Sequence, residues 1–478
     1  MLMLIISIPA FMILILRLHE RCRVIDLDLD VSAGKRFFFV YIYYKQARMR
    51  NDRRHFLQKA GAATASALLT SLTAPAWAKD LQQAFHHVEG VNADQLATEE
   101  DFWYYIQQSF TLSSGLINLN NGGVSPAPKT VQDAMKRYYD LCNEAPSYYM
   151  WRVLDQGREP LRKKLARLAG CSPEEIAINR NSSEGLETAI FGLSLKAGDE
   201  VVAAKQDYPN MTNAYKQREM RDGIKMVWID LQMPSEDEDY LVQQYVKAFT
   251  AKTKLVHVTH MINLNGQILP VKKIAAEAHK RGIEVIADGA HSFAHIDFKI
   301  PDLDCDYFAT SLHKWLYAPI GSGMLYVKKE KIKKLYPLFA SDNPLKDDIR
   351  KFESLGTRPF FIEQAIGEAI AYHDMIGNER KQKRLHYLKN YWMEQVKDIP
   401  KVKLNTSLHP AWGCAIGNIG VEGKPPGALD SFLFDKYKIH AVGIDMEHVK
   451  GVRITPNIYT TTKDLDVLVE AITVFAKS

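Results

Sequence analysis

Short apolar runs rich in β-branched residues alternate with helical patterns from about residue 115 to about residue 355. The runs TKLVHVTHM (253–261) and IEVIADGAH (283–291) are typical of buried strands, and KKIAAEAHKRG (272–282) between them is typical of a helix with Gly282 as its C-cap. Strands that alternate with helices usually form parallel sheets, because a parallel connection needs a crossover helix. The pattern therefore predicts an α/β fold with a mostly parallel sheet flanked by helices.

The same reading predicts how the rest of the chain is organised. Beyond residue 356 the pattern becomes helix-rich and then mixed, which indicates a smaller α+β C-terminal domain over 356–478 behind a large domain over 115–355. Residues 79–114 are expected to form an N-terminal helical arm. The five cysteines are scattered without a C-x-x-C pair, so neither a disulfide framework nor a zinc site is expected.

The first 78 residues differ in charge from the rest of the chain. They contain 11 Lys or Arg and 5 Asp or Glu, whereas the remaining 400 residues carry a net charge of −1. The basic excess therefore belongs to this leader. The body shows no basic footprint of the kind that nucleic-acid-binding proteins carry, and no nucleic-acid partner is expected.

Two signals lie within the leader. The uncharged run of 16 residues before Arg17 is shorter than the roughly 20 residues of a membrane span, so no stable span is expected in the mature protein. Residues 49–78 combine Arg53 and Arg54, an alanine-rich stretch and a small-residue site that ends at Ala78. This order resembles a twin-arginine export signal, which implies a periplasmic or secreted protein.

An export signal belongs at an N-terminus, and Met49 immediately precedes the basic patch of this one. We hypothesise that translation begins at Met49 and that residues 1–48 are upstream sequence. A peptide from residues 24–44 in the unprocessed precursor would contradict this.

Lys314 stands between His313 and Trp315, 26 residues after Asp288. A lysine amine is a nucleophile toward carbonyl groups once its pKa is lowered, and the apolar neighbours of Lys314 can bury it. Asp288 ends an apolar strand, where parallel sheets place their ligands, and a buried carboxylate needs a partner such as a protonated ring nitrogen. Taken singly, a lysine is more often a solvated surface residue, and an acid such as Asp288 is more often a helix N-cap or a partner in a buried salt bridge.

A phosphate cradle is predicted beside them. Ser182 and Ser183 stand just before an apparent helix, where hydroxyl and free backbone N–H groups bind phosphate or simply cap the helix. Ser311 and His313 add hydrogen-bonding groups next to Lys314. An amine for a Schiff base, an acid for a pyridinium nitrogen and a phosphate cradle are what pyridoxal 5′-phosphate requires from a protein.

The segment DGAHS (288–292), followed by TSLHKWLYAPIGSGMLYV (310–327), resembles the class V aminotransferase family of pyridoxal-phosphate enzymes. The resemblance covers about residues 115–470 and lies nearest the isopenicillin N epimerase-like branch, with cysteine desulfurases and kynureninases as relatives. It implies the pyridoxal-phosphate transferase fold type I, an amino-acid substrate, and a homodimer with shared active sites.

The resemblance also implies roles for individual residues. Lys314 would form the internal aldimine and shuttle a proton, and Asp288 would pair with the pyridine nitrogen. Arg453 would clamp the substrate carboxylate, and Asn121 with Gly122 would line the substrate mouth. Contacts to the cofactor are implied for Ser182, Ser183, Tyr208, Asn263, Asp288, His291, Ser311, His313, Lys314 and, from the neighbouring subunit, Thr357.

Several reactions remain open on this reading. Family desulfurases carry a cysteine shortly before the arginine, but residues 438–453 contain none, and Cys414 lies in AWGCAIGNIG (411–420), which is typical of a strand. An aminotransferase needs only the shared set of residues and is expected first. An epimerase, with Tyr208 or His260 as the second acid or base, a cysteine-independent lyase, and a non-catalytic exported binding protein are the alternatives.

Overall fold

The computed structural model of the protein describes residues 24–30, 37–42, 76–446 and 448–478. The predicted export signal over 49–78 lies outside these residues except for its last three positions, where helix α2 (Ala76–His87) begins. Strands β1 (Val24–Asp30) and β2 (Phe37–Ile42) form an antiparallel pair. No helix among the described residues combines the length and the apolar character needed to span a bilayer.

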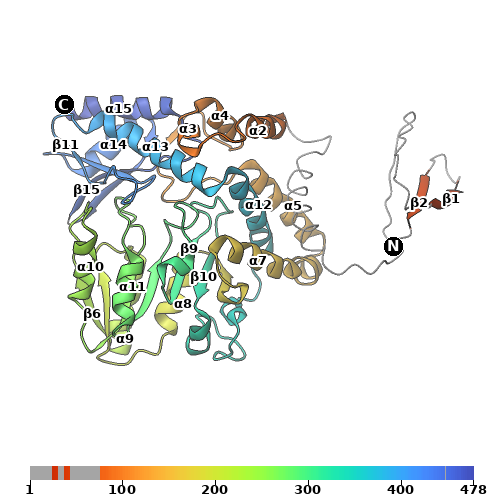
Figure 1. The fold of residues 1–478 in the computed structure, drawn as a ribbon, viewed down its shortest axis with the longest axis horizontal. Helices are drawn as coiled ribbons and strands as arrows, with labels where there is room; N and C mark the ends of the chain where they lie inside the picture. The colour runs from red at the N-terminus through yellow and green to blue at the C-terminus, as the bar shows by residue number, and fades with distance from the viewer. Residues whose placement is uncertain (1–23, 31–36, 43–75, 447) are drawn as a thin grey trace. The chain divides into compact units, whose positions relative to one another are not determined.

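A seven-stranded sheet forms the centre of the body (Figure 1). Its strands lie in the order β4 (Ile176–Asn179), β10 (Gly323–Val327), β9 (Tyr307–Ser311), β8 (Glu284–Asp288), β7 (Thr253–Thr259), β5 (Glu200–Ala204) and β6 (Lys225–Ile229). Strand β10 is antiparallel to both of its neighbours, whereas the pairs from β9 through to β6 are all parallel. The predicted mostly parallel α/β sheet is thus confirmed.

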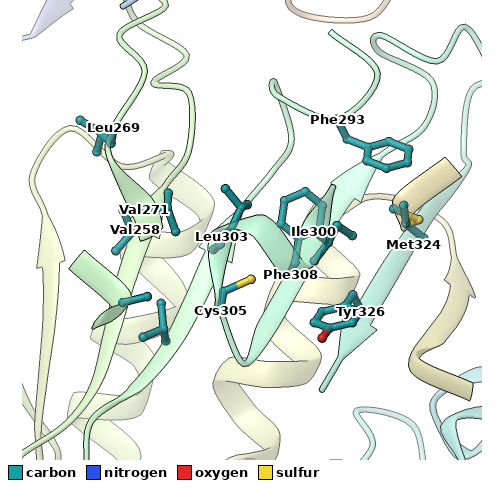
Figure 2. Close-up of a cluster of buried hydrophobic side chains, with 14 of the residues drawn as sticks. Val258, Leu269, Val271, Phe293, Ile300, Leu303, Cys305, Phe308, Met324 and Tyr326 are labelled. Carbon is teal, nitrogen blue, oxygen red and sulfur yellow. The ribbon is translucent and has the colours of Figure 1, made fainter. Parts of the chain in front are cut away.

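Successive residues of the central strands enter two different cores. In β8, Val285 and Ala287 belong to one buried cluster, while Ile286 between them belongs to the cluster on the opposite face. Figure 2 shows part of the first cluster, with Phe293, Phe308 and Met324 packed together. Because both faces are covered, the strands read in sequence as continuous apolar runs rather than as an alternation.

Helices cover both faces of the sheet. Apolar residues of α7 (Arg158–Ala169), α10 (Glu238–Val246), α11 (Val271–His279) and α12 (Phe360–Ile376) enter the first cluster, and those of α8 (Ser182–Gly192) and α9 (Pro209–Asp222) enter the second. Helix α5 (Lys129–Glu144) contacts α12. Helix α11 was expected to be capped by Gly282, but its C-cap is Lys280, and Gly282, with φ +70°, takes the left-handed turn just beyond.

A smaller antiparallel sheet follows in the chain. Its strands lie in the order β11 (Val402–Leu404), β12 (Gly417–Val421), β15 (Val449–Ile454) and β14 (Val442–Met446). Apolar residues of α13 (Asn378–Val396), α14 (Pro426–Tyr437) and α15 (Thr462–Lys477) share one core with β12 and β15, and Figure 1 shows these helices together with this sheet. This unit has the α+β character that the sequence predicts for the C-terminal part.

Residues 76–125, which precede the large sheet in the chain, contact both the large and the small sheet regions. Helices α2, α3 (Ala93–Leu96) and α4 (Glu100–Gln108) contribute to a cluster that includes Trp315 and Ile458. Strand β3 (Ile117–Asn118) pairs in parallel with β13 (Ile439–His440). Residues 117–125 therefore run along the C-terminal unit before the chain enters the large sheet.

The strand order reverses between β5 and β7, because β6 lies outside β5 whereas β8 and β9 lie beyond β7. Open α/β sheets bind their ligands at such a switch point, outside the carboxyl ends of the strands. The turn after β8 also needs Gly289 there, since a Cβ atom at that position would lie 1.8 Å from the Phe308 ring. A ligand site is therefore expected at the carboxyl ends of β5, β7, β8 and β9.

Candidate active site

Side chains from four neighbouring strands converge at this edge of the sheet. Thr259, Asp288 and Ser311 are the last residues of β7, β8 and β9, and Asp207 follows β5. They lie at or beside a cavity of about 330 Å³. It is lined by Gly122, Gly123, Val124, Asn181, Ser182, Ser183, Leu186, Tyr208, Met211, Thr259, Asn263, Asp288, Ala290, His291, Ser311, His313, Lys314 and Arg453.

Lys314 projects its amine into the cavity from the loop after β9. Its Nζ lies 3.0 Å from Nε2 of His291. Burial, reinforced by the positive charge of Arg453 and opposed by Asp288, lowers the pKa of Lys314 to about 8. The unprotonated amine, which is the form that attacks an aldehyde, is therefore far more populated near neutral pH than for a lysine in water.

Asp288 faces the same cavity with little exposure to solvent. Its Oδ1 accepts a hydrogen bond from the backbone N–H of Ala290 at 2.9 Å, and the described residues offer it no ion-pair partner within 4.0 Å. Burial raises the pKa of Asp288, which the Ala290 hydrogen bond and the charge of Lys314 only partly oppose. A bound cationic ring nitrogen would supply the missing partner, because a buried carboxylate is stable as an anion only when paired.

The first turn of α8 forms the opposite wall. Asn181 caps the helix by accepting the N–H of Glu184 at 2.9 Å, so Ser182 and Ser183 are its first two residues rather than its cap. Ser311 Oγ accepts the N–H of Ser182 at 2.9 Å and donates to Ser182 Oγ at 3.0 Å. The positive end of the helix and these hydroxyl groups form a site suited to a phosphate.

His313 completes this wall. Its Nδ1 lies 3.0 Å from the carbonyl oxygen of Ser322, which can only accept, so Nδ1 carries a proton. Burial and the nearby charge of Lys314 lower the pKa of His313 to about 4. A phosphate dianion at this wall would favour the protonated ring and thereby gain a second N–H donor at Nε2.

Arg453 enters the cavity from β15 of the smaller sheet. Its Nη1 donates to the Asn263 carbonyl oxygen and its Nη2 donates to Asn120 Oδ1, both at 2.9 Å. Its Nε is buried without a partner among the described residues. Burial lowers the pKa of Arg453 to about 10. A guanidinium with an unused donor in an enclosed cavity is suited to bind a carboxylate.

Asn121 corrects one expectation from the sequence. It does not line the cavity: its side chain is fully buried and bonded to Thr455 O, Asn118 and Tyr459. The preceding Asn120 is the residue that contacts Arg453, and Gly122 lines the cavity as expected. The sequence NLNNGG does not distinguish Asn120 from its neighbour Asn121. In the structure a backbone β-bridge joins Asn120 to Thr455, and it is the Asn120 side chain that contacts Arg453.

Most other expected residues also converge on the cavity. Tyr208, 42% exposed, lines it from the start of α9, and Asn263 lines it with a buried Oδ1 that has no partner among the described residues. His260 is buried with its ring edge against Phe298 and is not among the lining residues. Thr357 is exposed in the loop before α12 and does not reach the cavity of its own chain, so its predicted contact with a neighbouring subunit stays a prediction.

Cys414 lies away from the cavity. It occupies a bend three residues before β12, and not a strand as expected. It is almost completely buried, and burial raises the pKa of its thiol to about 12. No cysteine stands among the residues that line the cavity, so none of the described thiols is placed as a nucleophile there.

The sequence reading missed a second buried acid. Asp207 accepts the Thr259 hydroxyl at 2.6 Å and the Ala204 N–H at 2.8 Å. Burial raises the pKa of Asp207 to about 7, and the negative charge of Asp288 adds to the shift. The sequence does place Asp207 shortly after an apolar strand and next to Tyr208. Acidic residues are common after strands, however, and no neighbouring motif marks this one as part of a site.

The residues present fit a ligand that combines an aldehyde, a basic ring nitrogen and a phosphate. Each group would meet a side chain or helix end of matching chemistry: Lys314, Asp288 and the first turn of α8. Arg453 and Asn263 keep buried polar atoms that the described residues leave without partners, which leaves donors and acceptors for a substrate in the same space.

The model of the family described as "Aminotransferase class-V" matches residues 117–468. Among proteins of similar sequence, isopenicillin N epimerase of Streptomyces clavuligerus is 25% identical over 77% of this chain and 97% of its own length. A probable cysteine desulfurase of Halalkalibacterium halodurans is 29% identical over 60% of this chain and 73% of its own.

Solved structures share the fold. The apo structure of a cysteine desulfurase from Thermococcus onnurineus superposes with a TM-score of 0.69 at 21% identity, over 79% of this chain and 98% of that one. The cystine C–S lyase C-DES, in complex with its product cysteine persulfide, superposes with a TM-score of 0.68 at 19% identity, over 75% of this chain and 98% of that one.

Proposed function

Because the chain belongs to the class V aminotransferase family of pyridoxal-phosphate enzymes, we propose that it is an aminotransferase acting on an amino acid, or a related amine, that carries a free carboxylate. The observation that carries the proposal is the convergence of Lys314, Asp288, the first turn of α8 and Arg453 on one cavity. The first three groups fit the cofactor and the fourth fits the substrate.

When bound, pyridoxal 5′-phosphate withdraws electrons from the substrate Cα, so that a proton can leave this carbon. Asp288 would hold the protonated ring nitrogen of the cofactor. Lys314 would hold its aldehyde end and, once its amine is free, would serve as the base that carries the substrate Cα proton. Arg453 orients the substrate through its carboxylate, which fixes Cα near that amine.

Aminotransfer is the first choice because it needs a single base. Lys314 alone would serve both proton transfers. A general base works best when its pKa is close to the surrounding pH, and the pKa of Lys314, about 8, is close to neutral pH. The carboxyl edge of the sheet, the first turn of α8 and the loop after β9 form walls of this site.

An epimerase is the second candidate, and one observation favours it. Epimerisation needs an acid on the face opposite the lysine, and Tyr208 lines the cavity, whereas His260 does not. The similarity to isopenicillin N epimerase points the same way. A cysteine-independent lyase is the third, suggested by desulfurase relatives together with a cavity lined by no cysteine. A non-catalytic binding protein would have no need for both Lys314 and Asp288 in one cavity.

Borohydride reduction of the cofactor-loaded protein is expected to attach a pyridoxyl group to Lys314 alone, as detected by peptide mass spectrometry. Lys389 is a matched internal control: it too is a buried lysine with a pKa lowered to about 8, but its Nζ donates to the Ser407 carbonyl oxygen away from the cavity. Lys314→Ala is expected to abolish the label. Labelling of Lys389, or none in the wild type, would contradict the proposed site.

Single-turnover reaction with L-amino acids distinguishes the reactions. An aminotransferase converts its bound cofactor to the pyridoxamine form and releases one 2-oxo acid per site, with no second substrate present. An epimerase keeps the aldehyde form and yields the D-amino acid, and a lyase releases the substrate side chain. Either of the last two outcomes, seen without the pyridoxamine form, contradicts the aminotransferase proposal.

We further propose that the protein is an exported homodimer with shared active sites. Tyr139, Tyr148 and Trp151 are large exposed side chains near α5, and Ile320, 70% exposed, follows Lys314 in the loop before β10; a second copy would bury such groups. Export rests on the twin-arginine pattern at Arg53 and Arg54. Sedimentation should give a dimer, and the exported protein should begin after Ala78; a monomer or an intact leader would contradict these points.

A further inference from the structure

His291 lies between two nitrogen groups that fix the position of its proton. The Trp315 indole Nε1–H donates to His291 Nδ1 at 3.5 Å, and Lys314 Nζ lies 3.0 Å from Nε2 on the other side of the ring. An indole nitrogen can only donate, so His291 Nδ1 must accept. A neutral imidazole that accepts at Nδ1 carries its proton at Nε2, facing Lys314.

The indole is held firmly in this position. Trp315 is fully buried, and its ring stacks on His295 with centroids 3.6 Å apart and planes 19° apart. His295 is fixed in turn, because the Ala415 N–H donates to its Nε2 at 3.0 Å and its Nδ1 then donates to the His291 carbonyl oxygen at 2.7 Å. The Trp315 carbonyl oxygen accepts from the buried amine of Lys381.

We propose that Trp315 and His291 form a hydrogen-bond relay, indole N–H to Nδ1 and Nε2–H to Lys314 Nζ, that favours the unprotonated form of the Lys314 amine. The Nε2–H needs an acceptor, and only an unprotonated amine has a lone pair to offer. A protonated Lys314 would place two donors face to face, or would force the His291 proton to Nδ1 and leave the buried indole N–H without an acceptor.

The surroundings of Lys314, taken together, also favour its unprotonated form. Asp288, from β8, favours the charged amine, whereas Arg453, from β15, and burial favour the neutral one. Burial and the positive charge of Arg453 lower the pKa of His291 well below its ordinary value and keep its ring neutral. His313 on the same loop is also held neutral near pH 7. The relay would lower the pKa of Lys314 further, through the direction of its hydrogen bonds.

The inference rests on the proposed function for its use. An unprotonated Lys314 amine would be able to condense with the aldehyde of pyridoxal 5′-phosphate, with the two amine protons and the aldehyde oxygen leaving as water. The relay therefore makes Trp315 a positioning residue for cofactor capture. A glutamine at position 291 could act in the same way, because its amide oxygen accepts and its amide nitrogen donates.

The test is the titration of Lys314 in the full-length chain stripped of cofactor. Trace acetylation with acetic anhydride, followed by mass spectrometry of the Lys314 peptide, gives a rate that rises with pH as the amine loses its proton. In the wild type this rate should be half-maximal near pH 8, the value to which its surroundings lower the Lys314 pKa. Trp315→Phe should move the midpoint upward by about one pH unit, a tenfold change in the protonation equilibrium.

Two further variants serve as controls. His291→Gln should keep the midpoint near that of the wild type, since the amide can replace both contacts. Trp392→Phe removes another fully buried indole, one whose N–H has no partner among the described residues, and should leave the midpoint unchanged. An unchanged or lowered midpoint in a folded Trp315→Phe protein would overturn the relay.

A second measurement covers a Trp315→Phe protein that fails to fold. Nitrogen-15 NMR of histidine-labelled wild-type protein should show His291 with a protonated Nε2 and an unprotonated Nδ1, and the opposite tautomer would overturn the proposal. Failure of the proposed function is separate from both results. It would appear as an absence of cofactor binding to the wild type, while the acetylation midpoints still report on the relay.

Discussion

The candidate site depends on the meeting of parallel strands at the point where their order reverses. The connections that follow β5 and β7 run in opposite directions along the sheet, which leaves a crevice at the carboxyl ends of these strands. Asp288, Thr259 and Ser311 are end residues of adjacent strands, and the rigid sheet fixes their spacing. The first turn of α8 and the loop that carries Lys314 complete the walls, while Arg453 comes from the second sheet.

Burial is the second constraint, because it moves the pKa values of two ionisable groups close to neutral pH. In water at neutral pH Lys314 would be a cation and Asp207 an anion, but burial in the cavity and beside it moves their pKa values to about 8 and about 7. Histidines 291, 295 and 313 are held neutral by the same desolvation. In such a site the direction of each hydrogen bond matters alongside charge, and the proposed relay assigns the donor-only indole of Trp315 a part in it.

Local patterns in the sequence were sufficient for the elements and for most of the site. Strand β8 and its terminal Asp288 could be predicted because both faces of the sheet are buried and the run is apolar throughout. The reversed direction of β10, the contact of Asn120 with Arg453 and the stacking of Trp315 on His295 could not be predicted. Each depends on contacts between segments distant in sequence, and short patterns carry no information about those.

The central claim is that Asp288 and Lys314 hold a pyridine ring between them, with the carboxylate on the ring nitrogen. Nitrogen-15 NMR of ring-labelled pyridoxal 5′-phosphate bound to the full chain tests it most directly. The account predicts a protonated ring nitrogen in the wild type at pH 7 and an unprotonated one in Asp288→Asn, since the amide cannot balance the positive charge. The same shift in both proteins would contradict the account.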